Sequence, residues 1–556
     1  MKYHIPSILI SILFLFSSHA VFSKTTAIVV SEQRLASQAG VDILRAGGNA
    51  IDAAVAVGYA LAVVNPCCGN IGGGGFMLIH LANGKNIFLN FREKAPLNAN
   101  KNMYLDDKGK VIENMSTKGY LAVAVPGTVL GLDTALQKYG TMSRKQVMAP
   151  AIRLAKNGFA VTEFDARLSR KFEKDFLEQP NVAAIFLKNN RPYLIGERMV
   201  QADLAKTLQM IADKGPVVFY RGAIAKAIVA ASRANGGILS MEDFARYTVE
   251  FNKPVSCQYH DYTIISSPPP SSGGTTLCEM LNILEDLPLD PAGLRKADNI
   301  HFITEAMRYG FTDRNSDLGD PDFVNNPVDR LISKSYAASI SKKILSAKTL
   351  PATKGTTSHR ELTDTTHYSV LDKDGNAVSV TYTINGFFGA RVIADHTGFF
   401  LNDEMDDFSA KSGTANNFGL VMSDTNDIQP GKRPLSSMTP TIVMKSGRLY
   451  MVLGSPGGPR IITAVLLTLL NVIDFHMTLQ QAVDAPRFHY QVDPDRIDIE
   501  PDAFSSATIK ALNNMGYKVN QQGTWAAVEG ILIDPASNKS VGVNDRRRSA
   551  GAALHD

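Results

Sequence analysis

The chain has 556 residues, of which 45% are hydrophobic and 20% are charged. This composition is typical of globular proteins, and the length allows one large core or more than one domain. The formal net charge of only +4 excludes the concentrated basic surface that a nucleic-acid partner requires.

Residues 1–23 have the pattern of a secretory signal peptide. A basic start at Lys2 precedes an apolar run over residues 8–16, and Ser18-His19-Ala20 then offers a small-x-small cleavage site. This run is too short to cross a bilayer core of about 30 Å. We therefore expect a periplasmic or secreted protein with no membrane attachment once the signal is removed. The alternative is an uncleaved membrane anchor.

The next segments have helical and then strand-like patterns. Residues 31–63 carry an apolar, small-residue face at helical spacing. Gly72–Gly75 then lead into an apolar run over residues 76–79. Four successive glycines predict a backbone that packs very closely against another segment or a ligand. Residues 87–92 predict a second strand that ends in an arginine.

The four cysteines are Cys67, Cys68, Cys257 and Cys278. Adjacent cysteines such as the first two rarely form a comfortable disulfide with each other, and pairing of either with Cys257 or Cys278 needs an oxidising compartment. The sequence leaves the pairing open. No CxxC or HExxH motif is present, so we expect no metal site and no cofactor.

The middle of the chain, residues 140–345, is mostly helical in pattern. Pro268–Gly274 interrupts it, and we expect this stretch to be a rigid loop that caps a helix over residues 275–284. Residues 350–364 contain few apolar side chains and predict a flexible linker.

A predicted β-hairpin follows the linker. Residues 367–371 and 377–383 are strand-like and flank a turn centred near Asp374. Cross-strand partners then have numbers that sum to about 748, so Thr365 faces Thr383 at a Cβ distance of about 4.5–5.5 Å. The Thr383 hydroxyl can therefore hydrogen-bond that of Thr365. A register slip of one residue would turn the side chain away.

Thr365 stands where the linker meets this hairpin, directly after Asp364. A threonine hydroxyl needs a base to act as a nucleophile. At a new N-terminus, its own α-amine, with a pKa of about 7.7–8.0, can serve. Attack of the Thr365 hydroxyl on the Asp364 carbonyl would form an ester, and hydrolysis of that ester would expose this amine. The alternative is a polar strand entry with no chemistry.

Several short motifs are spread over the predicted mature chain. They are Asn65-Pro66 with Gly72–Gly75, Phe91-Arg92-Glu93, Pro268–Gly274, Thr365–Val370, Thr381–Asn385, Met405–Phe408, Arg433–Met438 and Gly454–Gly458. In this order and spacing they resemble the γ-glutamyltransferase (γ-glutamyltranspeptidase) family of N-terminal-nucleophile hydrolases. The combination is highly specific, although each motif alone would be weak.

The resemblance implies an α+β fold, a four-layer αββα sandwich, in a precursor that cuts itself between Asp364 and Thr365. After the signal peptide, residues 24–364 would form a large subunit and residues 365–556 a small catalytic subunit. The two would remain together without a covalent link, as a heterodimer that is one folding unit.

The resemblance also assigns catalytic roles. Thr365 corresponds to the nucleophile and Thr383 to the threonine that positions it. Gly457 and Gly458 correspond to the oxyanion hole, for which unobstructed backbone N–H groups are suited. The alternative for the two glycines is a tight turn.

Further residues correspond to a clamp for the γ-glutamyl group. Arg92 would hold its α-carboxylate bidentately, with hydroxyl donors from Ser436 and Ser437. The groups that recognise the α-ammonium and orient the substrate would be Asn385, Glu404 and Asp407. The alternatives are a surface ion pair for Arg92, helix capping for the serines and ordinary solvation for the acids.

Some positions depart from the family pattern, and Gly386-Phe387 after Asn385 is less typical of it. Phe418 stands where several bacterial relatives carry a tyrosine on a lid loop over the site. Without that hydroxyl, a possible hydrogen bond that closes the lid is lost, which bears on the balance between hydrolysis and transfer.

The implied function is that of an exported, self-processing γ-glutamyltransferase and glutathione hydrolase. Thr365 would attack glutathione or another γ-glutamyl compound and pass the acyl group to water, an amino acid or a peptide. A cephalosporin (glutaryl) acylase is one alternative, although it needs no recognition of an α-ammonium, and Glu404 and Asp407 argue against it. The other alternative is an unprocessed, exported binding protein.

Overall fold

The computed structural model describes residues 26–291, 293–346, 365–534, 537 and 539–556. The predicted signal peptide and the whole of the predicted linker, including Asp364, lie outside the described residues. Within the described ranges, no helix combines the length and the apolar character needed to cross a membrane.

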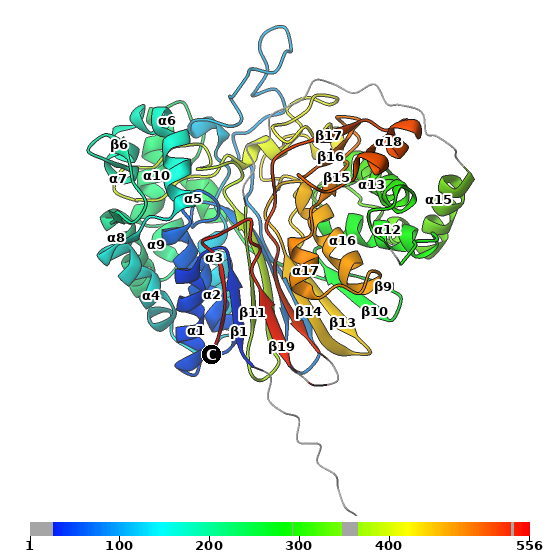
Figure 1. The fold of residues 1–556 in the computed structure, drawn as a ribbon. Helices are drawn as coiled ribbons and strands as arrows, with labels where there is room; N and C mark the ends of the chain where they lie inside the picture. Colours follow the sequence, from blue (N-terminus) through cyan, green and yellow to red (C-terminus); the bar gives the residue numbers. More distant parts are fainter. Residues whose placement is uncertain (1–25, 292, 347–364, 535–536, 538) are drawn as a thin grey trace, which may run out of the picture.

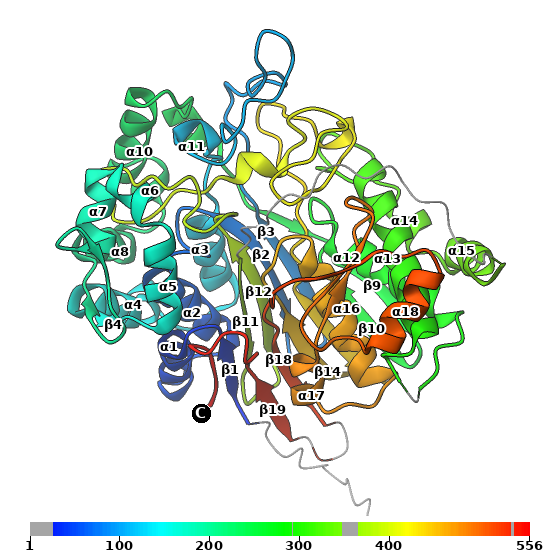
Figure 2. The ribbon, with the colours of Figure 1, turned by 45° about the horizontal axis from the view of Figure 1, so that its top comes forward.

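Two antiparallel sheets pack face to face at the centre of the protein (Figures 1 and 2). The first has seven strands in the order β20-β1-β11-β12-β2-β3-β8 and the second has six in the order β19-β18-β14-β13-β10-β9. The first sheet comprises β1 (Ile28–Ser31), β2 (Gly74–His80), β3 (Asn86–Phe91), β8 (Glu250–Asn252), β11 (Thr366–Leu371), β12 (Ala377–Thr383) and β20 (Ala552–His555). The second comprises β9 (Val255–Tyr259), β10 (Tyr262–Ser266), β13 (Thr441–Lys445), β14 (Arg448–Gly454), β18 (Glu529–Ile533) and β19 (Ser540–Val543).

An apolar layer between the sheets is built from alternate strand residues, because successive side chains of a strand point to opposite faces. Phe76 and Leu78 of β2 belong to it, together with Ile442 of β13 and Val452 of β14. The intervening residue Met77 packs instead into the helical layer outside the first sheet.

Helices cover the outer face of each sheet (Figure 1). Outside the first sheet lie α1 (Arg34–Arg45), α2 (Ala50–Val64), α3 (Thr128–Tyr139), α4 (Arg144–Asn157) and α8 (Ala202–Lys214). Outside the second lie α12 (Gly273–Glu285), α13 (Ala297–Asp317), α15 (Lys334–Ser346), α16 (Arg460–Ile473) and α17 (Leu479–Asp484). The predicted four-layer αββα sandwich is confirmed.

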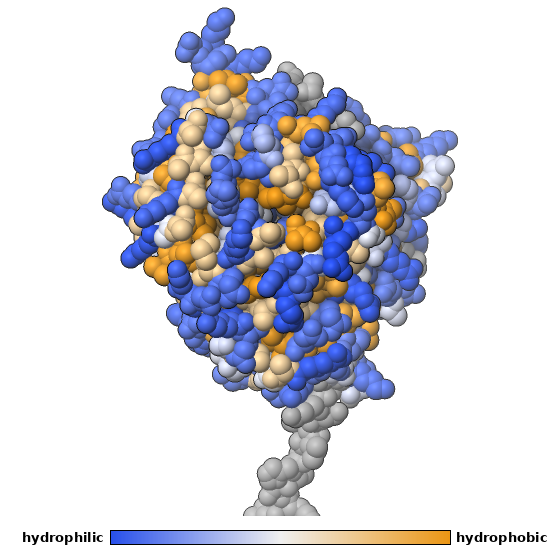
Figure 3. All heavy atoms as spheres, turned by 90° about the vertical axis from the view of Figure 1, so that its left-hand side faces the viewer, coloured by the Kyte–Doolittle hydropathy of each residue, from blue (hydrophilic) through white to orange (hydrophobic). Residues whose placement is uncertain are grey.

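Shorter elements complete the outer layers. They are α5 (Glu163–Lys171), α6 (Glu173–Leu177), α7 (Pro180–Phe186), α9 (Val217–Tyr220), α10 (Ala223–Ala234), α11 (Met241–Arg246), α14 (Val328–Leu331), α18 (Ser506–Asn514), β4 (Phe159–Ala160), β5 (Leu187–Lys188), β6 (Arg191–Pro192), β7 (Arg198–Met199), β15 (Phe488–His489), β16 (Ile497–Ile499) and β17 (Val519–Gln521). Figure 3 shows the outer face of the first helical layer as a mosaic of hydrophilic and apolar side chains. Scattered apolar groups of this kind are ordinary on a protein surface.

The helical pattern over residues 31–63 corresponds to two helices, α1 and α2. The second begins at Ala50 and is capped by Asn49, whose side chain accepts hydrogen bonds from the N–H groups of Ile51 and Asp52. This cap explains why the chain starts a new helix there. The prediction of mostly helix for residues 140–345 is confirmed, but the range also contains the two-residue strands β4 to β7 and the strands β8, β9 and β10, which are three to five residues long. The alternation of apolar and polar residues in such short strands cannot be distinguished from the surrounding helical pattern.

Two disulfides are present, Cys67–Cys68 and Cys257–Cys278. The expectation that adjacent cysteines do not pair with each other is wrong here. Their loop turns tightly after α2 and packs against the segment that follows β12, where the Cys68 carbonyl accepts from Ile384 N (3.0 Å). The second disulfide ties β9 to α12.

The glycine run packs against the backbone of neighbouring segments, as predicted. A Cβ atom on Gly73 would lie 1.8 Å from the Thr383 carbonyl oxygen, and one on Gly75 would lie 2.5 Å from that of Thr381. No larger residue fits at these distances. The glycines therefore let β2 approach the end of β12 that carries Thr383.

The β-hairpin has the predicted register. β11 pairs with β12 from Thr366↔Tyr382 to Leu371↔Ala377. Continued by one residue, this register places Thr365 opposite Thr383. A local sequence pattern thus determined the geometry at the predicted nucleophile.

Candidate active site

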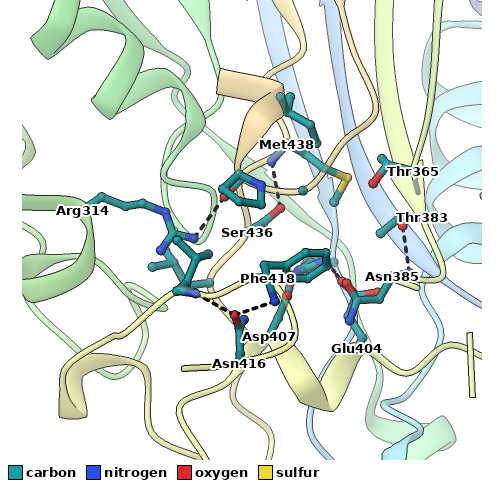
Figure 4. A pocket seen from close by; sticks show the side chains of 17 residues that line it. Arg314, Thr365, Thr383, Asn385, Glu404, Asp407, Asn416, Phe418, Ser436 and Met438 are labelled. Atoms are coloured by element: carbon teal, nitrogen blue, oxygen red, sulfur yellow. Dashed lines mark hydrogen bonds and ion pairs between the residues drawn. The ribbon is translucent and has the colours of Figure 1, made fainter. Parts of the chain in front are cut away.

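Most of the predicted site residues line one cavity at the end of β11 and β12 (Figure 4), which we call the Thr365 cavity. The predicted residues that line it are Arg92, Thr365, Thr383, Asn385, Glu404, Asp407, Phe418, Ser436, Ser437 and Gly458. Gly457 borders a neighbouring cavity instead, and Asp364 lies outside the described residues. The volume is only about 20 Å³, roughly the space of one water molecule.

Thr365 and Thr383 lie side by side in the Thr365 cavity (Figure 4). The Thr383 hydroxyl accepts a hydrogen bond from Asn385 N at 2.8 Å. Asn385 adopts a left-handed conformation (φ 76°), and its side chain donates to the Asp403 carbonyl at 3.1 Å. The loop after β12 therefore orients the hydroxyl that lies next to Thr365.

Gly457 and Gly458 form the turn between β14 and α16. Both have positive φ, 127° and 55°, a conformation that other residues rarely adopt. Neither N–H donates to a backbone carbonyl in the described part of the chain. With the N-terminus of α16 directly behind them, both N–H groups can stabilise a developing negative charge.

Arg92 is buried at the end of β3 in a cluster of opposite charges. Its side chain forms ion pairs with Glu404 and Asp407, and its Nε donates to the Pro434 carbonyl at 3.2 Å. Glu93 Oε2 lies 3.7 Å from Arg92 Nη1. The alternative of a surface ion pair is wrong, because the Arg92 side chain is only 1% exposed.

Burial shifts the pKa values in this cluster. It raises the pKa of Glu404 well above its usual range and that of Glu93 to about 7, although Arg92 opposes both shifts. Burial alone would lower the pKa of Arg92, but attraction by Glu404 and Asp407 outweighs it and raises this pKa. Three acids thus surround a single guanidinium, so an added cationic group would be stabilised beside them.

Arg314 is a site residue that we did not predict. It projects from α13 into the Thr365 cavity (Figure 4) and donates to Ser272 Oγ (3.0 Å) and Ser437 Oγ (3.1 Å). Burial lowers its pKa to about 10, so it remains cationic at neutral pH. One signal was available: Arg314 continues the buried stripe of Ile303, Met307 and Phe311 at helical spacing, where a charged residue is unusual.

The Pro268–Gly274 loop is hydrogen-bonded to the segment that carries Ser436 and Ser437. Ser272 N donates to the Ser436 carbonyl and Ser436 N donates to the Pro270 carbonyl, both at 2.8 Å. The predicted helix over residues 275–284 is confirmed, but α12 begins two residues earlier, at Gly273. The larger role of the loop is tertiary, because it holds the segment that carries Ser436 and Ser437.

Phe418 lines the same cavity, on the loop where the sequence predicted a lid (Figure 4). Its ring is 5% exposed, and backbone groups hold the loop. Phe418 N donates to Asn416 Oδ1 at 3.0 Å, and Gln491 Nε2 donates to the Phe418 carbonyl at 2.9 Å. The loop is therefore placed over the cavity without a side-chain hydroxyl.

His367 lies two residues after Thr365 and is fully buried. Its ring hydrogen-bonds Thr381 Oγ1 (2.8 Å) and Ser369 Oγ (3.1 Å), and burial lowers its pKa to about 3. In the unfolded chain, histidine has a pKa of about 6.5. Protonation below that pH therefore favours the unfolded chain, so the stabilisation is complete above pH 6.5 and is lost as the pH falls toward 3.

We expect His367→Gln to remove one part of this acid sensitivity. Each pH unit below 6.5 should cost the wild type about 1.4 kcal/mol through His367, or about 2 kcal/mol at pH 5. Denaturant unfolding at pH 7 and pH 5 measures this difference, with His396→Asn at an exposed histidine as the control. An equal loss of stability in wild type and His367→Gln would contradict the prediction.

Comparisons with known proteins identify a matching family model, similar relatives and similar solved structures. The family model described as gamma-glutamyltranspeptidase matches residues 36–555. The glutathione hydrolase proenzyme of Pseudomonas sp. (strain A14) is 50% identical over 553 residues, 97% of this chain and 96% of that protein. The crystal structure of Helicobacter pylori gamma-glutamyltranspeptidase is 49% identical, with a TM-score of 0.55 over 56% of this chain and 89% of that chain. The cephalosporin acylase structure from Bacillus halodurans is 27% identical, with a TM-score of 0.85 over 100% of this chain and 98% of that chain.

Proposed function

The chain belongs to the gamma-glutamyltranspeptidase family, and we propose on this premise that Thr365 is its nucleophile. The protein is a self-processing γ-glutamyltransferase and glutathione hydrolase. The observation that carries the residue assignment is that Thr365 shares one buried cavity with Thr383, Gly458 and the Arg92 cluster.

In the proposed reaction, the Thr365 hydroxyl attacks the γ-carbonyl carbon while the α-amine of the processed Thr365 takes its proton. The carbonyl oxygen becomes an oxyanion beside the N–H groups of Gly457 and Gly458. The leaving amine departs with the proton and an ester to Thr365 remains. Water then yields glutamate, or an amino acid or peptide yields a new γ-glutamyl amide.

Charge pairing supports the proposed orientation of the γ-glutamyl group. Its α-carboxylate would lie against Arg92 and Arg314, with the hydroxyls of Ser436 and Ser437 near. Its α-ammonium would lie against Glu404, Asp407 and Asn385. Arg92 now pairs with these same acids, so a zwitterion can enter by exchanging partners with them, with no net change in the buried charge.

We propose that cleavage between Asp364 and Thr365 gives a large subunit of residues 24–364 and a small subunit of residues 365–556. In the first sheet, β11 of the small piece pairs with β1 of the large piece, and β12 pairs with β2. Such interleaving supports a stable heterodimer after the cut. Both disulfides lie within the large piece, so neither links the two pieces.

The substrates proposed are glutathione and other γ-glutamyl compounds, with amino acids or peptides as acceptors. We also propose export to the periplasm or beyond. The signal-peptide pattern of residues 1–23 supports that location.

A glutaryl acylase remains the second candidate, because the cephalosporin acylase of B. halodurans has a similar fold. The Arg92 cluster favours a γ-glutamyl substrate over a glutaryl substrate. A glutaryl group lacks the α-ammonium that Glu404 and Asp407 would pair with, so it would leave the acidic side of the site unmatched.

The test compares γ-glutamyl-p-nitroanilide with glutaryl-p-nitroanilide, which differs only in lacking the α-ammonium. We expect kcat/KM to be at least about 100-fold higher for γ-glutamyl-p-nitroanilide, because its α-ammonium forms a buried charge pair that the glutaryl substrate cannot form. Protein sequencing should find two pieces, one of which begins at Thr365. Preference for the glutaryl substrate would identify an acylase, and a single 60.2 kDa chain without turnover would indicate a binding protein.

A further inference from the structure

A second cavity, of about 270 Å³, adjoins the proposed oxyanion turn. Gly457 borders this cavity, whereas the next residue, Gly458, borders the Thr365 cavity. We call it the arginine cavity, because four arginines line it: Arg167, Arg460, Arg547 and Arg548. Among the described residues, no acidic side chain lines it.

Three of the four guanidinium groups form ion pairs with carboxylates that do not themselves line the cavity. Arg460 pairs with Asp498 (3.1 Å), Arg547 with Asp545 (3.0 Å) and Arg548 with Glu32 (3.3 Å). These pairs, with a further one between Arg547 and Glu500, hold the side chains in place. The carboxylates are not part of the lining, so the cavity itself presents guanidinium groups.

Arg167 differs from the other three. It is an exposed residue of α5 and forms no ion pair with another described residue. Its Cζ lies 5.4 Å from the ring centroid of Phe164, and Arg548 Cζ lies 4.2 Å from the same centroid. Both guanidinium groups therefore lie near one ring, in a cavity whose described lining contains no carboxylate, so an added anion would be attracted to them.

We propose that the arginine cavity binds the free carboxylate of the amine partner in the reaction. Arg167 and Arg548 would hold the carboxylate of an acceptor amino acid or dipeptide. They would hold equally the carboxylate of the cysteinylglycine that leaves from glutathione. This inference rests on the proposed function.

The position of the oxyanion turn supports this assignment. The charged end of the γ-glutamyl group occupies the Thr365 cavity, and its carbonyl oxygen lies at Gly457 and Gly458. The nitrogen substituent must therefore leave that cavity, and the arginine cavity begins on the other side of the same turn. Acceptor and leaving amine use one path, because transfer is the reverse of acylation with a different amine.

The chemical step involves no added reactant. The acceptor nitrogen forms a bond to the acyl carbon, the bond from that carbon to Thr365 Oγ breaks, and a proton passes from the nitrogen to Oγ through the Thr365 α-amine. The arginines take no part in these bonds and act as binding groups.

The experiment compares two acceptors, glycylglycine and glycylglycine amide, with γ-glutamyl-p-nitroanilide as donor. The two acceptors present the same amine, but only the first carries a carboxylate. In Arg167→Gln, we expect the ratio of KM for glycylglycine to KM for the amide to rise about tenfold, because one charge-assisted hydrogen bond is lost. Arg167→Lys should restore part of the ratio.

Arg170→Gln is the matched control, since Arg170 is exposed on α5 and does not line the cavity. It should leave the ratio as in wild type. An unchanged ratio in Arg167→Gln, or an equal rise for both acceptors, would overturn the proposal. Failure of the proposed function is distinct, because wild type would then not turn over the donor at all.

Discussion

Thr365→Ala should yield a full-length, inactive chain. Without the hydroxyl there is no nucleophile for the Asp364 carbonyl, so the chain stays uncut near 60.2 kDa and no α-amine is formed. The loss of γ-glutamyl turnover should reach at least about 10⁴-fold, since nucleophile and base are removed together. Gel electrophoresis and an assay on γ-glutamyl-p-nitroanilide measure both effects.

The control is Thr365→Ser, which keeps a hydroxyl on the same backbone and should still be cut. Thr365→Ser removes one methyl group, and Thr365→Ala removes that methyl group and the hydroxyl, so the fold should be retained in both variants. Appearance of the same two pieces from Thr365→Ala would show that another residue is the processing nucleophile.

Replacement of Arg92 has the second large effect. In Arg92→Lys the positive charge remains beside Glu404 and Asp407, but the planar fork that can hold a carboxylate at two points is lost. We expect KM for γ-glutamyl-p-nitroanilide to rise about 100-fold, from the loss of two charge-assisted hydrogen bonds. Processing should continue, because the cut needs no γ-glutamyl binding.

Arg92→Ala tests how much Arg92 contributes to protein stability, as distinct from substrate binding. It leaves the buried acids without their cation, which costs about 3–5 kcal/mol, so its unfolding should be measured beside its kinetics. If KM in Arg92→Lys stayed at the wild-type value while the protein was folded and processed, Arg92 would not hold the substrate carboxylate.

The features predicted correctly are those that depend on neighbours in the chain. The register of the hairpin around Asp374 followed from strand periodicity and a short turn. The close approach at Gly73 followed from a run of residues without Cβ atoms. The four-layer fold, by contrast, was implied by the family resemblance that the motifs carry together, and no single element would have identified it.

Other features depend on distances through space. Arg314 reaches the serines only because α13 packs beside the Pro268–Gly274 loop. The three short strands between residues 250 and 266 gain their stability from neighbours in the sheets rather than from their own pattern.

The sequence by itself determined the position of Thr365 opposite Thr383, the glycines at the proposed oxyanion turn and the membership of a family. These depend on backbone geometry and on local spacing, which the chain specifies over a few residues. Only the tertiary structure decided that Arg92 pairs with Glu404 and Asp407, that Arg314 joins them, and that an arginine cavity begins beyond Gly457. Charges interact according to their separation in space and their burial, and neither quantity can be obtained from positions along the chain.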